Sequence, residues 1–447
     1  MRKMTHNMTT GSIPGHLLRY SGPAILGDLV QVTYNTVDSV IVGKYAGAGA
    51  LAAVGVASPL MSIAMFFIIG MGIGASVLMS EFYGAGDLRS LRREFATTLA
   101  MGEAFSAVIA LGLFALAVPL LKLVRAPAEI LPDTAGYLRI VALGMVVTSF
   151  YNLLAAVSRS IGDTLTPLMC LVAGSLVNVE LDLLFVARFG WGVAGAAWAT
   201  VISQGVAALL CGVLLRRTEP VLFEGRGDFA VDRALLNKTV RFSAPSALQQ
   251  AGIYVGKLLV QSAVNPLGVS AIAAFNAVNR IDDYALIPER DIATGETVLV
   301  AQNHGAGKPE RMEKGFRAAL ILEIAYGLVV SLAVFGLAEP LMRLFVGPEE
   351  AEVVRLGARY LRLMGLFYIL PGITNGLQGY MRALGKLKLT MYVTYAQMFT
   401  RAIFTYALIG RLGLDAVPLA CAAGWVLMTV WEGGLMVRWK GRGGNSQ

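Results

Sequence analysis

Long apolar runs recur along the whole chain and constrain its fold more than any other feature of the sequence. A helix needs about 20 mostly apolar residues to cross a bilayer, and each run meets that length. The runs predict twelve membrane-spanning helices, at residues 20–43, 51–80, 95–120, 138–158, 165–187, 193–215, 242–264, 271–300, 317–338, 357–380, 389–410 and 415–437. Only 15% of the 447 residues are charged, whereas soluble domains carry about 25%, so the chain lacks the charge to cover a water-exposed globule. We therefore predict an all-α membrane protein with no separate soluble domain.

The cysteines and the N-terminal segment add little chemistry. Cys170, Cys211 and Cys421 all lie inside apolar runs, which is not the pattern of a disulfide framework. The first residues are polar and lack a small-residue cleavage site after an apolar core, so we expect no removable signal peptide. The first predicted helix then serves as the insertion signal.

The basic residues are distributed unequally between the two sets of connecting segments. The N-terminus, every second loop and the C-terminus hold 23 Lys and Arg, the remaining loops hold 10, and four lie within predicted helices. The positive-inside rule therefore places both termini in the cytoplasm. The net charge of +8 is a signal of topology on this interpretation, and it does not indicate nucleic-acid binding.

The sequence repeats itself at about half its length. Residues 74–87 read GASVLMSEFYGAGD, and residues 295–308, 221 positions later, read GETVLVAQNHGAGK. PLLKLVRAP corresponds to PLMRLFVGP at the same offset, and the pattern N-x6-R-x2-G at 152–162 returns at 375–385, at an offset of 223. Several matches in the same order indicate an internal duplication. We expect the glycines of both GAG segments to make tight turns, because neither has the spacing of a phosphate-binding loop.

Each half of the repeat holds six predicted spans, an even number, so both halves begin on the same side of the membrane. This makes a parallel repeat related by an axis along the membrane normal. We predict an N-terminal six-helix lobe over residues 1–215, a cytoplasmic connector over 216–240 and a C-terminal six-helix lobe over 241–447. A cleft between two such lobes would open to each side of the membrane in turn.

The first predicted helix carries a polar stripe. Asp28, Gln31, Asn35 and Asp38 are spaced by 3, 4 and 3 residues, which puts them on one helical face, and Tyr34 borders that face. Lipid cannot solvate such a stripe, so we expect it to face the protein interior or a water-filled cavity. Charged residues inside spans are costly and by default mark functional sites.

The fifth predicted helix carries Asn178 and Asp182 one turn apart, whereas Glu180 points elsewhere on the helical wheel. Thr200 follows in a run of small residues in the sixth helix. A pair of carboxylates with amide and hydroxyl oxygens nearby could hold a proton or a hard cation such as Na⁺. With no histidine or cysteine in the set, a transition metal is not expected. The alternative is a network of interhelical hydrogen bonds that holds no ion.

The second half has a different polar pattern. Asn276, Asn279 and Asp283 share a face of the eighth predicted helix, which is also rich in charge up to Glu296 and is expected to kink at Pro288. This face either forms a polar wall for cationic ligands or pairs its charges internally. We expect substrate between the lobes, near polar faces that have no other place to be solvated: Gln31, Tyr34, Asn35, Asn152, Asn276, Asn279 and Asp283.

These residues lie in stretches that resemble the multidrug and toxic compound extrusion (MATE) transporters over essentially the full length. The stretches are VTYNTVDSVIVGKYAGAGALAAVGVASP, SEFYGAGD, RSIGDTLTP, SLVNVELDLLF, GWGVAGAAWATVISQ and VAQNHGAGKPER. The pattern is most similar to the DinF-like and MepA-like bacterial and archaeal branch. The resemblance implies a secondary active multidrug efflux transporter that exchanges H⁺ or Na⁺ for cationic or amphipathic organic compounds by alternating access.

The resemblance also implies roles for individual residues. The family's coupling-ion site would correspond to Asp38, Asn178, Asp182 and Thr200, with Tyr34 beside it, and Na⁺ is possible at Asp38 and Asp182. Pro23 lies where the family's first helix bends. The second-half acids of the NorM-like branch are absent.

Two other classes of function fit the sequence less well. A flippase for a lipid-linked glycan is the nearest alternative, but it would need several basic residues in its cleft, and the first-half cleft is acidic. An intramembrane enzyme is disfavoured because the chain has no HExxH, GxS or paired-histidine motif. We expect no enzyme activity, no cofactor beyond the coupling ion and no nucleic-acid partner. We expect a monomer in the cell membrane, the inner membrane of a bacterial cell.

Overall fold

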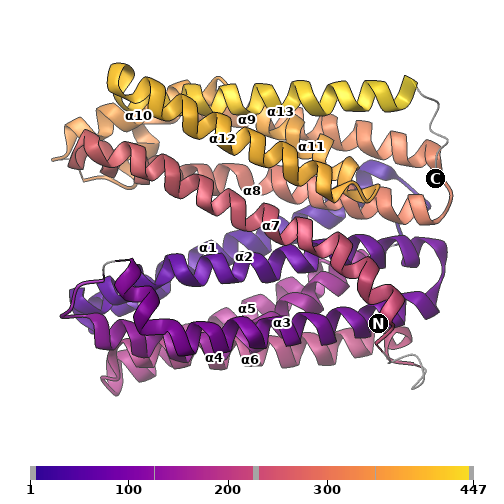
Figure 1. The fold of residues 1–447 in the computed structure, drawn as a ribbon, viewed down its shortest axis with the longest axis horizontal. Coiled ribbons are helices and arrows are strands. Elements are labelled where there is room, and N and C mark those ends of the chain that lie inside the picture. The colour runs from indigo at the N-terminus through magenta and orange to yellow at the C-terminus, as the bar shows by residue number, and fades with distance from the viewer. Residues whose placement is uncertain (1–6, 125, 225–230, 348, 442–447) are drawn as a thin grey trace. The chain divides into compact units, whose positions relative to one another are not determined.

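The computed structural model describes residues 7–124, 126–224, 231–347 and 349–441 (Figure 1). Within these ranges there are helices and no strands, which confirms the all-α prediction. Residues 225–230 of the predicted connector lie outside the described part of the chain. The α-helices are α1 (Ile13–Tyr45), α2 (Gly47–Ala85), α3 (Leu88–Leu123), α4 (Leu131–Ser160), α5 (Leu165–Asp182), α6 (Gly192–Thr218), α7 (Arg233–Val264), α8 (Val269–Gly305), α9 (Pro309–Arg343), α10 (Ala351–Gly365), α11 (Ile369–Ala383), α12 (Leu387–Leu412) and α13 (Ala416–Gly441).

Ten of the predicted spans each correspond to one α-helix, the fifth corresponds to α5 continued by a short π-helix over Leu183–Arg188, and the tenth is broken. The sequence predicts a continuous span over 357–380, but a turn at residues 366–368 separates α10 from α11. Pro371 explains the break, because its ring would clash with the carbonyl of Phe367 in a continuous helix. At the third position of α11 its missing N–H costs no hydrogen bond. By contrast, α1 continues through Pro23 and α8 continues through Pro288.

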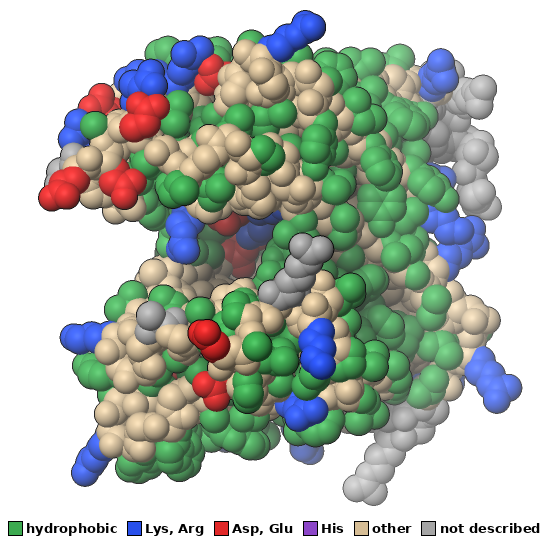
Figure 2. All heavy atoms as spheres, turned by 60° about the vertical axis from the view of Figure 1, so that its left-hand side comes forward, with side chains coloured by type: hydrophobic (Ala, Val, Ile, Leu, Met, Phe, Trp, Pro, Cys, Tyr) green, Lys and Arg blue, Asp and Glu red, His purple; other side chains and the backbone are tan. Residues whose placement is uncertain are grey.

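Seven helical stretches within the described residues are long and apolar enough to cross a membrane. They are Gly49–Ala85, Leu88–Leu123, Leu131–Ser160, Leu165–Arg188, Gly192–Thr218, Pro309–Arg343 and Leu387–Arg438, and the last contains both α12 and α13. Large exposed side chains are apolar, as at Leu111, Leu209 and Leu332, and Figure 2 shows hydrophobic side chains over wide areas of the face it presents. Such a surface suits lipid, and the chain is a multi-pass membrane protein. The less apolar helices α1, α7, α8 and α10–α11 carry many of the interior polar residues.

The chain forms two compact units. The first comprises Gly22–Ala251 with Ala301–Gly307 and the described residues up to Thr10, and the second comprises Gly11–Ser21, Gly252–Val300 and the described residues from Lys308 onward. In the first unit α4 packs against α2, α3 and α6. In the second, α9 packs against α10 and α11, and α12 packs against α13. Helices α1, α7 and α8 each contribute to both units.

The two GAG segments end α2 and α8 with turns of the same kind. Their second glycines, Gly86 and Gly307, have φ angles of 73° and 65°, a left-handed conformation that favours glycine. The prediction of tight turns is therefore confirmed. The next helix begins differently in the two halves: at α3 the side chain of Asp87 accepts a hydrogen bond from the Ser90 amide at 3.0 Å, whereas Lys308 makes no side-chain cap for α9.

The first glycines of the GAG segments serve a second purpose, which is close packing between helix ends. A Cβ atom at Gly84 would lie 1.9 Å from the backbone oxygen of Gln302, and one at Gly305 would lie 1.9 Å from the backbone oxygen of Glu81. These contacts lie within the first unit. Gly305 is the repeat counterpart of Gly84, and Gln302 is that of Glu81, both at an offset of 221, so the duplication has produced a symmetric helix crossing that only glycine permits.

Candidate functional site

Asp38 on α1 and Asp182 at the end of α5 lie together in the first unit. Their carboxylates are within hydrogen-bonding distance of each other. Asp182 is fully buried, and no donor among the described residues reaches either of its oxygens or Oδ1 of Asp38. Two ionised carboxylates repel each other and have lost their hydration here, so the pair is stable only with a bound proton or a cation between the oxygens.

The backbone around Asp182 departs from a regular α-helix. Directly after it, residues Leu183–Arg188 form a short π-helix, η1. Stacking between Phe185 and Trp191, with ring centroids 4.8 Å apart, anchors this segment. Gly195 at the start of α6 allows the close approach, because a Cβ there would lie 3.1 Å from Cβ atoms of both aromatic residues. Short π-helical turns are frequent at functional sites, and this one fixes where the Asp182 carboxylate points.

Two tyrosines border the carboxylate pair. Tyr34 lies one turn before Asp38 on α1, and its hydroxyl is close to both carboxylates and to the side chain of Gln204. Tyr137 on α4 is also close to both carboxylates and to Tyr34. The sequence patterns predicted Tyr34 at this site but not Tyr137 or Gln204. Tyr137 begins the YLR triplet that recurs at 360–362, and Gln204 follows Thr200 by one helical turn, so both signals were present in the sequence.

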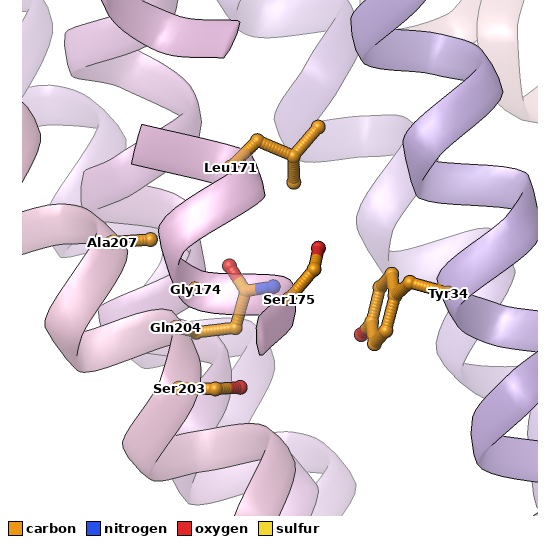
Figure 3. Close-up of a pocket in the computed structure, with 7 residues that line it drawn as sticks. All are labelled: Tyr34, Leu171, Gly174, Ser175, Ser203, Gln204 and Ala207. Atoms are coloured by element: carbon orange, nitrogen blue, oxygen red, sulfur yellow. The ribbon is translucent and has the colours of Figure 1, made fainter. Parts of the chain in front are cut away.

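A narrow pocket extends from this site between α1, α5 and α6 (Figure 3). The empty space between its lining residues is about 180 Å³ when space open to solvent is counted, and the pocket is too narrow in this structure for a water-sized sphere. Figure 3 shows the ring of Tyr34 facing the side chains of Ser175 and Gln204 across the gap. The lining residues are Tyr34, Leu171, Gly174, Ser175, Ser203, Gln204 and Ala207. The same tyrosine therefore borders both the carboxylate pair and the pocket.

The remaining members of the predicted ion site differ in their surroundings. Asn178 is fully buried one turn before Asp182, and neither atom of its amide has a hydrogen-bond partner among the described residues. Thr200 is partly buried, and its hydroxyl donates to the carbonyl of Ala196 at 3.0 Å, which leaves its oxygen available as an acceptor. Glu180 is exposed, so the prediction that it points away from Asn178 is confirmed.

The cleft residues predicted in the first half are less enclosed. Gln31 is partly buried and close to Tyr34, whereas Asn35 is exposed. The amide of Asn152 donates to the carbonyl of Thr148 in its own helix at 2.8 Å.

The cleft residues predicted in the second half all lie on α8. Asn276 is exposed and Asn279 is partly buried. Asp283 is exposed, and its Oδ1 lies 3.1 Å from Nζ of Lys257 on α7. This ion pair is the internal pairing that the sequence left open for this helix, so Asp283 does not present an isolated negative charge. The grouping of both sets into one cleft remains a prediction from the sequence.

Comparisons with known proteins identify the chain's relatives. The family model MatE matches residues 23–184 and 245–407, one segment in each half. The chain is similar to the probable multidrug resistance protein YpnP of Bacillus subtilis, with 28% identity over 384 residues that cover 86% of this chain and 85% of the relative. It is also similar to the FAD transporter of Shewanella oneidensis, with 26% identity over 358 residues, 78% of each chain.

Solved structures share the fold. The chain matches a crystal structure of MATE in the bent conformation over the full length of both chains, with a TM-score of 0.91 and 22% identity. The proteins matched by the MatE model are transporters, which agrees with the names of the relatives, so the expectation of no enzyme is confirmed. The family model covers well over half of the sequence, and the chain belongs to the MatE family.

Proposed function

We propose that the protein is a secondary active exporter of cationic and amphipathic organic compounds, driven by H⁺ or Na⁺ bound between Asp38 and Asp182. The observation that carries this proposal is a pair of facing carboxylates, with Asp182 fully buried and Asp38 partly buried, whose enclosed oxygens receive no hydrogen bond from a donor among the described residues. Burial makes an unneutralised pair unstable, so the pair must exchange one positive partner for another.

Competition for this charge gives a mechanism of exchange. When a proton or Na⁺ occupies the pair, its attraction for a cationic compound in the neighbouring pocket is lost. When the ion leaves, the carboxylates regain that attraction and repel each other, which favours a different arrangement of α1 and α5. Only a difference in affinity between two such states can drive transport, and the two halves would alternate access to the site.

The remaining groups around the pair have distinct roles in this proposal. Tyr34 and Asn178 supply the hydrogen-bonding shell of the ion, and the oxygen of Thr200 adds an acceptor that suits Na⁺. Gln31 and the pocket along α1, α5 and α6 contact the transported compound. Pro23 predisposes α1 to bend, because it removes one hydrogen bond of the helix.

The transported compounds are proposed from the relatives and from charge. Several relatives carry names of multidrug resistance or export proteins, and an acidic first-half site selects cations. One relative is named FAD transporter, and FAD is an anionic compound. Transport of FAD is therefore the most informative test against a preference for cations. We also propose a monomer in the cell membrane with both termini in the cytoplasm, from the asymmetry of Lys and Arg.

Gradient-driven efflux from proteoliposomes tests the proposal. Purified protein is reconstituted, loaded with a fluorescent organic cation and challenged with an imposed pH gradient or Na⁺ gradient. We expect one gradient to drive export in the wild type, and neither to do so in Asp38→Asn or Asp182→Asn. Glu180→Gln is the matched control, because this exposed carboxylate lies on the same helix, and its export should equal that of the wild type. Wild-type export in both aspartate variants, or gradient-driven transport of FAD alone, would overturn the proposal.

A further inference from the structure

The second unit contains a group of buried charges that the exchange at Asp38 and Asp182 does not use. We call it the second-half carboxylate cluster, and it comprises Glu289 and Glu296 on α8, Glu323 on α9, Glu432 on α13 and Arg382 on α11. All four glutamates are 0% exposed. The electrostatic partners of Arg382 are Glu296, Glu432 and Glu323, and Glu323 in turn lies near Glu289 and Glu296.

The carboxylates receive few hydrogen bonds. No donor among the described residues reaches either oxygen of Glu289 or of Glu296, and Glu323 approaches only the backbone of Gly376. Glu432 accepts one hydrogen bond, from Nε2 of Gln378 at 3.0 Å, and its other oxygen has no partner in the part of the chain that the structure describes. The neighbouring titratable groups are Tyr326 beside Glu289, and Tyr380, which lies near Glu296 and Glu313.

Two of the carboxylates point at the same face of α11. A Cβ atom at Gly376 would lie 2.3 Å from Oε2 of Glu323, and one at Gly379 would lie 2.7 Å from Oε2 of Glu296. Gly376, Gly379 and Arg382 are spaced by three residues, which places them along one side of the helix. The glycines therefore make room for the carboxylates beside the guanidinium.

The charges in this cluster do not balance. One guanidinium compensates one carboxylate, and an uncompensated charge is unstable in a buried, low-dielectric environment. The remaining glutamates must therefore be neutralised by a bound ligand. Within the described residues no group of three or more His, Cys, Asp or Glu has the arrangement to hold a metal ion, which leaves the proton as the ligand that fits.

The first half of the repeat shows that the packing does not require these acids. At the repeat offsets, Glu323 and Gly376 correspond to Gly102 and Leu153. There the same contact is apolar, because a Cβ atom at Gly102 would lie 2.5 Å from Cδ1 of Leu153. The second half has exchanged a leucine packed on a glycine for a glutamate packed on a glycine.

The positions of Glu296 and Gly379 show a similar replacement, of small residues in the first half by an acid in the second. Glu296 and Gly379 correspond to Ala75 and Ala156, which are both buried, whereas Arg382 corresponds to another arginine, Arg159. The arginine is thus common to both halves, and the carboxylates that surround it are specific to the second.

We propose that the second-half carboxylate cluster is a proton-binding site, separate from Asp38 and Asp182, that takes up and releases protons. The proton moves on and off a glutamate oxygen, with no other bond made or broken. Because the site is built from other residues than those of the proposed coupling ion, its existence can be tested whether or not that coupling proposal holds.

Infrared difference spectroscopy of the purified transporter, recorded as the pH is changed, tests this site directly, because a protonated carboxylic acid has its own carbonyl-stretch band. We expect bands that persist in the Asp38→Asn, Asp182→Asn double variant and lose intensity in Glu296→Gln and in Glu323→Gln. Glu310→Gln is the control, since Glu310 is exposed at the start of α9. If both cluster variants keep every band of the wild type, the proposal is wrong.

A second pair of variants separates proton binding from folding. Glu323→Gly combined with Gly376→Leu recreates the Gly102–Leu153 contact. Glu296→Ala introduces the first-half residue, Ala75, and Gly379 is kept because a Cβ atom there would lie 2.9 Å from the backbone oxygen of Ala293. We expect both to insert and fold, to lack the cluster bands, and to take up fewer protons in a pH-indicator titration of the detergent-solubilised protein. Proton uptake equal to that of the wild type in both would overturn the proposal.

Discussion

The two halves of this transporter share a backbone plan but differ in the chemistry of their interiors. In the first half, the proposed ion site lies on α1 and α5, and a further buried acid, Glu94 on α3, accepts hydrogen bonds from the hydroxyls of Thr98 and Thr239. The first-half positions that correspond to the second-half carboxylate cluster hold small and apolar residues. In the second half, buried acids occupy the corresponding contacts around α11. The glycines, the turns and one arginine are retained in both. The duplication therefore fixed the packing, while the polar residues inside it diverged.

The position of Asn178 gives the sharpest example. At the repeat offset its counterpart is Arg401 on α12, whose electrostatic partners include Tyr360 and Asp282. Asp282 also accepts a hydrogen bond from the hydroxyl of Tyr368. An amide beside two carboxylates in one half thus corresponds to a guanidinium beside one carboxylate in the other. A guanidinium does not suit a bound cation, so the proposed ion site at Asp38 and Asp182 has no counterpart at Arg401 in the second half.

The largest expected effect comes from removing the first-half charges. Asp182→Asn, at nearly constant volume, should reduce gradient-driven efflux on the order of a hundredfold, the range of a typical coupling free energy. Membrane insertion should be retained, because the substitution removes a buried charge. The efflux rate in proteoliposomes and the yield of folded protein measure the two effects. Comparable losses from Asp282→Asn in the second half would break the asymmetry between the halves.

Equivalent substitutions at the two glycines of the symmetric helix crossing should destabilise the protein equally. Gly84→Leu and Gly305→Leu each place a side chain against backbone atoms, and overpacking of this kind costs about 1–3 kcal/mol or more. We expect both variants to lower the thermal unfolding temperature in detergent by similar amounts. Gly112→Leu is the control, because nothing lies within 4 Å of a Cβ atom at that glycine. A large effect at only one of the two crossing positions would show that the contact is not symmetric.

The N-caps of α3 and α9 should produce a smaller difference in stability between the two halves. Asp87→Ala removes the N-cap of α3 and should destabilise the protein by about 1 kcal/mol. The Ser90 side chain and amide lower the pKa of Asp87, so its stabilisation is present above the usual aspartate pKa and is lost as the pH falls through its lowered value. Unfolding temperatures of the wild type and the variant should therefore differ at neutral pH and converge in acid. Lys308→Asp, which adds the missing cap to α9, should have the opposite sign at neutral pH.

The smallest expected effect concerns the segment that leads into α7. The pKa of Asp232 is lowered, mainly by hydrogen bonds from the Leu235 and Ala234 amides and further by Arg93, whose Nη1 lies 3.2 Å from Oδ2. The pair is partly exposed to solvent, so Arg93→Gln should change stability only slightly. Added salt should reduce the difference, and denaturation in low and high salt measures it. A loss of efflux in this variant would contradict the assignment of transport to the interior of the helices.

The sequence was sufficient for the spans and for the polar faces of single helices. The spacing of Asn178, Glu180 and Asp182 predicted which two side chains are buried, because one helix determines its own faces. The sequence did not predict which side chains of different helices come into contact. Glu323 and Glu432 are isolated acids on different helices, and no periodicity indicates that α9 and α13 bring them to Arg382. The break before α11 was missed for a different reason, since the apolar run hid the effect of Pro371.

The binding of an organic cation in competition with the coupling ion tests the central claim most directly. The affinity of the detergent-solubilised protein for tetraphenylphosphonium is measured by isothermal titration calorimetry as the pH and the Na⁺ concentration are varied separately. If Asp38 and Asp182 hold the coupling ion, affinity should fall as the proton or Na⁺ concentration rises. This dependence should disappear in Asp38→Asn and Asp182→Asn and persist in Glu180→Gln. An affinity for the cation that stays constant across all proton and Na⁺ concentrations in the wild type, or the same dependence in both aspartate variants, would contradict the claim.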